Sequence, residues 1–335
     1  MNQTYENIEI IVMIDGSKDN SEKIAREFAQ KDKRIQIIVK ENEGALKARV
    51  DAIEEARGEY IFSVDPDDWI ETNAVERLLI FAKKYNADIV RARGIREIVE
   101  INKRKLLPAA YEKEYYIEQK DFKEKFYPKV LRTFSCNSIW GQLIKKDIID
   151  TTNLDTSIHM GDDLNLNLEI YKKMKNIVFI PDVVYHYRYN NTSITKRTEL
   201  DYVYKKASDI GKVYYKLLEC LKEWDMNTKE NQKIVAIKLL RQVNVRNIDI
   251  FENKNKEENI EYIKKIMQLP EVEKCRKIVD ISDLKKNKNK SLKYLYLKDI
   301  NKYYKVMKNK IYLKIKVRNK LYLIYKQIVN IGKNI

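Results

Sequence analysis

The sequence has 335 residues, which is long enough for two domains or for one large α/β domain with an added element. Its hydrophobic share of 44% can form a buried core, so wholesale disorder is excluded. Its 8 glycines and 5 prolines exclude collagen-like and low-complexity chains. No apolar run approaches the roughly 18 residues of a membrane span. Three scattered cysteines form neither a disulfide framework nor a metal-binding pair, which favours a reducing compartment.

The positive charge is concentrated at the end of the chain. Residues 285–335 contain 15 lysines and one arginine but a single acidic residue, Asp299, and the formal net charge of the whole chain is +16. The preceding residues are therefore almost neutral. This distribution predicts a globular body with a cationic tail.

Strand and helix patterns alternate over the first hundred residues. Strands are predicted at 8–14, 35–39, 60–64 and 87–91, and helices at 21–30, 45–56 and 72–85. Such alternation predicts a mostly parallel sheet flanked by helices.

The rest of the chain changes character twice. Residues 95–130 are polar and show no clear period, so we expect a long irregular excursion over the sheet. Order returns at 138–149 and in a helix that begins near Asp163. Apolar residues at i+3 and i+4 spacing then predict helices from 200 to 269.

Carboxylates follow two of the predicted strands. Asp15 comes after the first strand, and Asp65, Asp67 and Asp68 come directly after the third. Ligands of open parallel sheets bind beyond the carboxyl ends of the strands, and oxygen ligands on one short turn suit Mg²⁺ or Mn²⁺. The alternative is that Asp67 or Asp68 only caps the next helix.

A second acidic point is Gly161-Asp162-Asp163, immediately before a leucine-rich helical pattern. One of these carboxylates could serve as a general base, positioned by a glycine that permits close approach. The alternative is that Asp162 or Asp163 caps the helix.

Several motifs occur in a fixed order along the first 195 residues. They are Asn2–Tyr5, Ile14–Ser21, Asn42–Gly44, Ala48–Arg49, Gly58–Ile61, Asp65–Trp69, Trp140–Lys145, Gly161–Asp163 and Tyr185–Ile194. As an ordered set they resemble the nucleotide-sugar domain of family 2 glycosyltransferases, which have the GT-A fold. The resemblance covers roughly residues 2–195.

The resemblance implies an organisation in three parts. Residues 1–198 would form a GT-A domain, an α/β nucleotide-sugar-binding fold, followed by a helical region at 199–284 and the basic tail at 285–335. Family members begin with another strand and helix before the Asn2–Tyr5 motif. We therefore expect this domain to be N-terminally incomplete, with a weakened donor site and an unpaired strand edge.

The resemblance also implies roles for individual residues. Asp15 would contact the base of a uridine-type nucleotide, and Arg49 would lie near that nucleotide. Asp65 and Asp67 would bind Mg²⁺ or Mn²⁺ at the diphosphate, with Asp67 the direct ligand. Asp163 would be the general base of a direct displacement with inversion. Ile14 and Asp162 depart from the family, which usually has Asp and Glu at these positions.

Two further positions carry weaker expectations. Trp140 is predicted to pack in the core or to form a wall of the acceptor site, because an aromatic face suits a sugar ring. Arg188 is expected at the substrate, and His186 close to it could approach the diphosphate. The alternative for His186 is a structural role, which is more common for a lone histidine.

The basic tail contains an amphipathic helical pattern. Its apolar stripe consists of Ile300, Tyr304, Met307, Ile311 and Ile315, with lysines around it. This pattern predicts an element that binds an anionic membrane surface. The alternatives are a stripe that packs on the body and, less compatible with a glycosyltransferase body, nucleic-acid binding.

Together these observations predict an inverting, metal-dependent glycosyltransferase. It would move a sugar from a nucleotide-sugar, a UDP-sugar by preference, to a growing surface polysaccharide or lipid-linked glycan. We expect it in the cytoplasm at the inner face of the membrane, with no nucleic acid as partner. The alternative is a truncated, catalytically impaired chain that acts only as a membrane-associated binding partner.

Overall fold

The structure is a computed structural model that describes residues 1–99, 102–189, 198–253, 255–285 and 290–311. Packing divides the chain into two compact units. The first comprises Met1–Ser193 and Lys216–Asn231, and the second comprises Ile194–Tyr215 and Gln232–Ile335. We describe each unit by itself. The predicted domain boundaries at 198 and 284 stay predictions.

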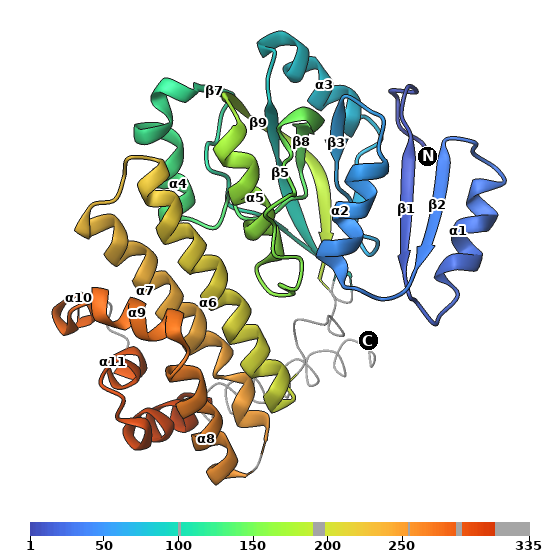
Figure 1. The fold of residues 1–335 in the computed structure, drawn as a ribbon. Helices are drawn as coiled ribbons and strands as arrows, with labels where there is room; N and C mark the ends of the chain where they lie inside the picture. Colours follow the sequence, from blue (N-terminus) through green and yellow to red (C-terminus); the bar gives the residue numbers. More distant parts are fainter. Residues whose placement is uncertain (100–101, 190–197, 254, 286–289, 312–335) are drawn as a thin grey trace, which may run out of the picture. The chain divides into compact units, whose positions relative to one another are not determined.

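The first unit begins with two strand–helix pairs, as the sequence predicts (Figure 1). They are β1 (Ile10–Asp15), α1 (Ser21–Ala29), β2 (Ile35–Lys40) and α2 (Ala45–Glu55). β1 and β2 are parallel and form a separate two-stranded sheet. Within the described residues β1 therefore pairs with one strand, β2. The expected N-terminal incompleteness stays a prediction.

A seven-stranded sheet forms the centre of the same unit. Its strands are β3 (Tyr60–Phe62), β8 (Gln142–Lys145), β5 (Ile89–Ile98), β9 (Asn176–Arg188) and β4 (Trp69–Ile70) in spatial order, with β6 (Lys103–Leu106) beside β5 and β7 (Tyr115–Glu118) beside β9.

This central sheet is mixed, and the expectation of a mostly parallel sheet is wrong for it. Only β5 and β9 pair in parallel; the other pairings in this sheet are antiparallel. The strand–helix alternation that predicts parallel pairing ends at β5. Among the later strands, β5 and β6 pair antiparallel, and the described residues between them contain no α-helix. β8 pairs antiparallel with β3 and β5 although one helix precedes it and another follows it, so the rule does not govern these strands.

Residues 95–130 are not the irregular excursion that their pattern predicts. They hold the end of β5, the strands β6 and β7, a π-helical turn at Phe122–Phe126 and α4 (Tyr127–Arg132). All four residues of β6 are exposed, because it is an edge strand. A strand with two solvated faces has no alternation of apolar and polar residues to detect.

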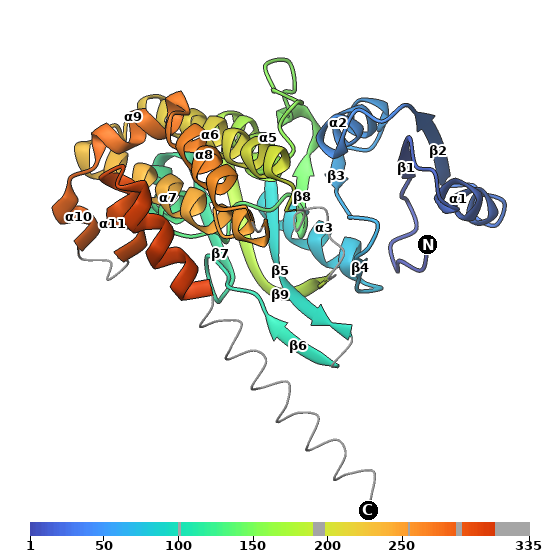
Figure 2. The ribbon, with the colours of Figure 1, turned by 90° about the horizontal axis from the view of Figure 1, so that it is seen from below.

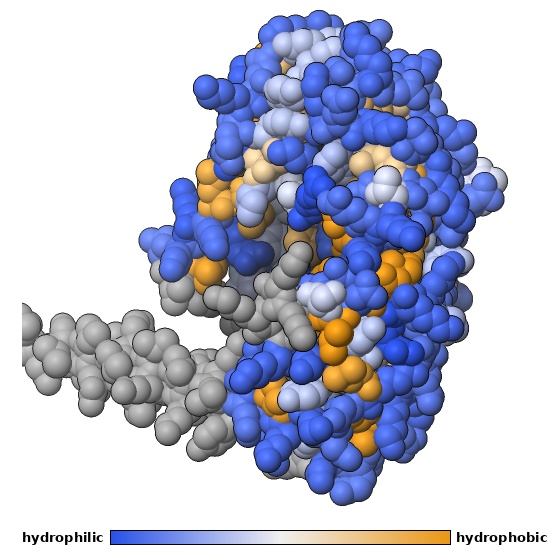
Figure 3. Space-filling model, turned by 90° about the vertical axis from the view of Figure 1, so that its left-hand side faces the viewer, coloured by the Kyte–Doolittle hydropathy of each residue, from blue (hydrophilic) through white to orange (hydrophobic). Residues whose placement is uncertain are grey.

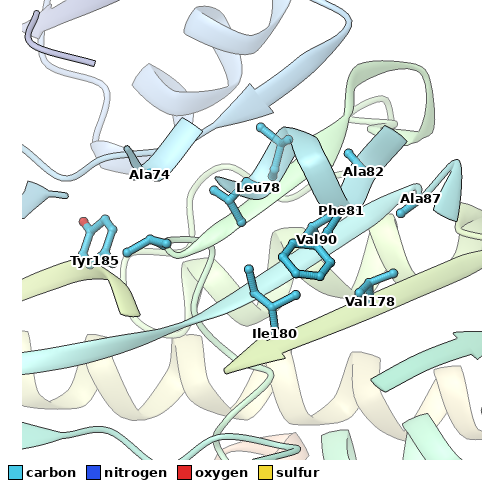
Figure 4. Packing of buried hydrophobic residues seen from close by; sticks show 11 residues of the cluster. Ala74, Leu78, Phe81, Ala82, Ala87, Val90, Val178, Ile180 and Tyr185 are labelled. Carbon is cyan, nitrogen blue, oxygen red and sulfur yellow. The ribbon is translucent and has the colours of Figure 1, made fainter. Parts of the chain in front are cut away.

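Helix α3 (Ala74–Tyr85) covers one face of the sheet with small and apolar side chains (Figure 4). Leu78 and Ala82 are fully buried and belong to a cluster that includes Val90 of β5 and Val178 of β9. Burial of each large apolar side chain contributes about 1.5–3 kcal/mol. This core fixes β5 and β9, and β9 carries Tyr185, a residue of the candidate site.

Helix α5 (Asp162–Lys173) is tied to the sheet by polar contacts. Its Asn167 is buried, accepts a hydrogen bond from the side chain of Gln142 in β8 at 2.8 Å, and donates to the carbonyl of Asn137 at 2.8 Å. Satisfied buried amides of this kind fix one arrangement of the surrounding backbone. They hold the segment between α4 and β8 against the start of α5.

The second unit is helical, as predicted. It contains most of α6 (Leu200–Glu223) and α7 (Lys229–Arg246), followed by α8 (Lys256–Met267), α9 (Pro270–Ile278), α10 (Ile281–Lys285) and α11 (Lys290–Tyr296). Residues 300–311 are helical as well. None of the helices in the described ranges is long and apolar enough to cross a bilayer.

The apolar stripe of the basic tail packs inside this unit over its described part. Ile300, Tyr304 and Met307 are buried, and the rings of Tyr304 and Phe251 lie 4.9 Å apart. The described stripe is therefore not free to enter a membrane. Ile315 lies outside the described residues. Figure 3 shows a face where hydrophilic residues predominate and hydrophobic residues form small, separate patches.

Candidate active site

Arg49 of α2 gathers three carboxylates that are far apart in the sequence. Its guanidinium lies 3.0 Å from Asp65, 3.2 Å from Asp163 and 3.5 Å from Asp162. The Arg49 side chain is only 14% exposed, so these ion pairs are poorly screened by water. The structure thus unites Arg49, Asp65 and Asp163, the residues that the sequence analysis assigned to the donor and to catalysis.

One guanidinium faces three carboxylates, and burial together with the excess negative charge raises the pKa values of two of them, Asp163 and Asp162. Burial raises the pKa of Asp163 to about 7; Arg49 opposes this shift, and Asp162 and Asp65 add to it. Burial also raises the pKa of Asp162. A carboxylate with a pKa near neutrality can accept a proton and later release it, which is what a general base requires.

The position of Asp163 argues against a simple capping role. Gly161 is the N-cap of α5, in the left-handed conformation with φ 84°, and no side-chain hydrogen bond caps the helix there. Besides Arg49, the Asp163 carboxylate accepts the backbone N–H of Ile139 at 3.2 Å. These contacts hold Asp163 at the cluster.

The Asp65–Asp68 turn leads into β4, not into a helix, so the interpretation of Asp67 or Asp68 as a helix cap is wrong. The Tyr185 hydroxyl accepts the Asp65 N–H at 3.0 Å and donates to Asp68 at 2.7 Å. The backbone N–H of Arg188 donates to Asp68 at 2.7 Å. Burial raises the pKa of Asp68 to about 6.

The sequence predicts that Asp65 and Asp67 bind Mg²⁺ or Mn²⁺, and the structure shows the surroundings of both side chains. Asp67 is exposed and Asp65 is half-buried, so both can offer the oxygen ligands that Mg²⁺ and Mn²⁺ prefer. In the part of the chain that the structure describes, no group of three or more His, Cys, Asp or Glu side chains could hold a metal ion. Within the described residues, Asp65 and Asp67 are therefore the two side chains of this turn that could hold a metal ion.

Asp15 has a different environment from the one expected. Its two carboxylate oxygens accept the backbone N–H groups of Glu43 and Gly44, each at 2.9 Å, and its carbonyl accepts the Asn42 side chain. Both carboxylate oxygens are therefore engaged in fixing the loop before α2. Gly44 has φ 99°, and a Cβ there would lie 2.7 Å from His159.

Trp140 lies next to Ile139, the residue that binds Asp163. Its indole stacks on Tyr185 at 4.9 Å and lies nearly parallel to Tyr187 at 6.4 Å. Gly94 of β5 permits this position, because a Cβ there would meet the indole at 2.7 Å. Trp140 is half-buried, so one part packs and another part stays accessible, as each of its two predicted roles requires.

His186 has the structural role that the sequence analysis left open. It is 6% exposed, and its ring nitrogens lie 2.8 Å from carboxylates of Glu97 and Glu71. Its ring stacks on Trp69 at 5.1 Å. The guanidinium of Arg188 lies 5.3 Å from the Trp69 ring, on an exposed part of the unit.

Sequence reasoning missed Tyr185, Tyr187 and Gly94 as parts of the site. The two tyrosines alternate with His186 along β9, and a period of two places them on one face of a strand. That signal was present, but no strand was predicted there. Gly94 offers no signal in one sequence, because its use depends on Trp140 from a distant segment.

The first unit thus brings one arginine and three aspartates from distant segments together. Sequence comparison identifies the family: the profile described as Glycosyl transferase family 2 matches residues 1–149. The glycosyltransferase GlyG of Streptococcus pneumoniae is 32% identical over 228 residues, which are 64% of this chain and 71% of GlyG. The chain therefore belongs to glycosyl transferase family 2.

Other proteins place this assignment in context. The glycosyltransferase GlyA of Streptococcus pneumoniae is 31% identical over 200 residues, 58% of this chain and 28% of GlyA. The chain spans between 28% and 60% of the length of three curated relatives that it matches. The crystal structure of TarS residues 1–349 from S. aureus has a TM-score of 0.63 and 18% identity, covering 92% of this chain and 83% of that one. At this identity the likeness shows a shared fold.

Proposed function

We propose that this glycosyltransferase moves a sugar from a UDP-sugar to a hydroxyl of a surface polysaccharide or lipid-linked glycan, with inversion. The cluster of Arg49, Asp65 and Asp163 carries this proposal. TarS has been crystallised in complex with UDP and with UDP-GlcNAc, which supports a uridine nucleotide as the donor of a protein with this fold.

The residues of the cluster have complementary roles in the proposed reaction. Asp163 accepts the proton of the acceptor hydroxyl as that oxygen attacks the anomeric carbon. Arg49 holds Asp163 and Asp65 in place and offsets part of their charge. The Ile139 N–H fixes one oxygen of Asp163 and leaves the other directed to Arg49.

Asp67, with Asp65, would hold Mg²⁺ or Mn²⁺. When bound, the ion would offset the charge that grows on the departing nucleoside diphosphate. Tyr185 keeps the turn in one shape through its hydroxyl, which contacts Asp65 and Asp68. Asp15, Trp140 and Arg188 keep their proposed substrate contacts, with Asp15 acting through the loop that it fixes.

Calorimetry with UDP in the presence and absence of Mn²⁺ tests this assignment. We expect metal-dependent binding by the natural chain and at least tenfold weaker binding by Asp67→Asn, since the diphosphate loses its counter-charge. Asp147→Asn, at an exposed site after β8, is the matched control. Metal-dependent binding by Asp67→Asn equal to that of the control would contradict the metal site.

We also propose that the chain works in the cytoplasm, at the inner membrane face, through the lysines of its basic tail. Lys302, Lys305, Lys308 and Lys310 are exposed on the helix whose apolar stripe is buried. The attachment would therefore be electrostatic over this part, without insertion of side chains into the bilayer.

A further inference from the structure

A row of side chains extends outward from Trp140 across three strands. Tyr187 of β9 lies opposite Arg96 of β5, and Arg96 lies opposite Lys105 of β6. Directly opposed residues share one face of a sheet, so these three side chains lie on the same face. Figure 2 shows β6 beside the far end of β5. The Tyr187 ring is nearly parallel to the indole of Trp140, and the Arg96 guanidinium lies 5.7 Å from the Tyr187 ring.

The charges of this row are unusual. Arg96 and Lys105 are like charges directly opposite each other, which destabilises a strand pair. In the described part of the chain neither of them forms an ion pair, and the Arg96 Nε is buried without a hydrogen-bond partner. Their neighbours differ in their ion pairs, because Arg93 pairs with Glu112 at 2.7 Å and Arg104 pairs with Glu97 at 3.2 Å, although Arg93 Nε also has no hydrogen-bond partner. Among the described residues, Arg96 and Lys105 are therefore two adjacent cations that form no ion pair.

One end of the row lies near Asp163, and the other end carries the two cations. Its inner end is Trp140, whose neighbour Ile139 binds the base Asp163, and its outer end is Arg96 with Lys105. Half-buried aromatic faces such as those of Trp140 and Tyr187 stack on the apolar faces of sugar rings. A guanidinium offers a planar fork of donors that matches phosphate and carboxylate oxygens.

We infer that this row is an acceptor subsite for an acidic glycan. A sugar ring of the acceptor lies on Trp140 and Tyr187, and an anionic group of that acceptor, a phosphate or a carboxylate, binds between Arg96 and Lys105. This inference rests on the proposed function and adds to it the charge class of the acceptor. The bound anion removes the repulsion between the two cations and uses the free donors of Arg96.

The test is binding of the full chain to an immobilised panel of matched oligosaccharides. Each backbone is present in neutral, phosphorylated and uronate form. We expect the natural chain to prefer acidic members by roughly tenfold, and the preference to weaken with added salt. The phosphate and uronate arms identify the source of the anion. Equal binding of neutral and acidic members, or binding of none, would overturn the inference.

Variants locate the effect. Arg96→Gln with Lys105→Gln should abolish the preference for acidic members, whereas Arg96→Lys should retain part of it. The control pair, Arg26→Gln with Lys31→Gln on and after α1, removes the same charge from exposed positions and should change nothing. A preference that survives in the Arg96 and Lys105 double variant would contradict the assigned subsite.

A separate measurement keeps this inference distinct from the proposed function. The Arg96 and Lys105 double variant should bind UDP as tightly as the natural chain does in calorimetry, because neither residue belongs to the Arg49 cluster. If the natural chain itself did not bind UDP, the proposed function would fail whatever the oligosaccharide panel showed. UDP binding without acidic preference would refute the acceptor subsite alone.

Discussion

Gly94 makes room for the indole of Trp140 because glycine has no side chain. The indole occupies the space that a side chain at 94 would need, since a Cβ there would lie 2.7 Å from it. The same indole stacks on Tyr185, the residue that pins the acidic turn. A side chain at position 94 should therefore disturb both the stacking of Trp140 on Tyr185 and the Asp65–Asp68 turn.

We predict that Gly94→Ala displaces Trp140 and destabilises the unit by about 1–3 kcal/mol, the usual cost of overpacking. Urea unfolding and near-ultraviolet circular dichroism measure the two effects. Gly58→Ala is the matched control, since the nearest atom to its added Cβ is 3.3 Å away. If the two variants gave the same spectrum and midpoint, the close packing of Trp140 on Gly94 would not be needed.

Tyr185→Phe tests the pin on the acidic turn. Loss of the hydroxyl leaves the Asp65 N–H and the half-buried Asp68 carboxylate without this partner, which costs about 1–3 kcal/mol. We expect lower stability in urea and weaker UDP binding. Tyr60→Phe is the control, because the Tyr60 hydroxyl makes only a long contact of 3.5 Å. If Tyr185→Phe and Tyr60→Phe changed stability and UDP binding equally, the hydroxyl of Tyr185 would not be needed to hold the acidic turn.

At the residue scale, the motifs predict charged residues of the site, and the roles of these residues stay predictions. Arg49, Asp65 and Asp163 come from segments far apart in the sequence, and the structure joins them. Asp15 is predicted to contact the nucleotide, and its carboxylate oxygens also accept backbone N–H groups. A carboxylate looks the same in a sequence whether it binds a ligand or a loop, so only the contacts separate the two roles.

At the scale of elements, periodicity predicted the early strands and helices and the helices of the second unit. It failed for β6 and β9, for two different reasons. The edge strand β6 is exposed on both faces and shows no alternation. β9 has a register irregularity against β5 near Arg93, which interrupts the period of two.

The helix at 300–311 tests how the basic tail binds. Substitution of Lys302, Lys305, Lys308 and Lys310 by Gln should weaken binding to phosphatidylglycerol vesicles by at least tenfold, since each lysine near an anionic surface contributes about 1 kcal/mol. Vesicle co-sedimentation measures this. Because the stripe is buried, salt at about 0.5 M should release the natural chain.

The control replaces four other exposed lysines of the helical unit by Gln. They are Lys256, Lys264, Lys274 and Lys277. Equal loss of binding by both variants would mean that total charge, not the tail, governs attachment. Binding that resists salt would mean that apolar insertion contributes.

At the scale of the whole molecule, the ordered motifs predicted the family, and the charge distribution predicted a nearly neutral body with a basic tail. Composition excluded disorder, and the order of the motifs indicated a GT-A unit, which the mixed sheet and the likeness to TarS bear out. The pairing of the later strands could not be predicted, because it depends on contacts between segments far apart in the chain. The acceptor side of the site depends on the same pairings, so Arg96, Lys105 and Tyr187 were not foreseen.

The central claim is that Asp163 is the general base of the transfer. It faces Arg49, which stays positive, and the carboxylates Asp162 and Asp65. The ionised form of Asp163 accepts the proton, so activity is present above its pKa and lost as pH falls through that value. With the pKa of Asp163 raised to about 7, kcat/KM should rise between about pH 6 and 8 and then level off.

The most direct measurement is the pH dependence of kcat/KM for UDP-sugar turnover by the natural chain, Asp163→Asn and the control Asp147→Asn. We predict an acidic limb with a midpoint near pH 7 for the natural chain and the control. Asp163→Asn should lose roughly 10²–10⁴ in turnover and lose that limb, while it still binds UDP. Turnover by Asp163→Asn within a few-fold of the natural chain, with the same acidic limb, would contradict the account.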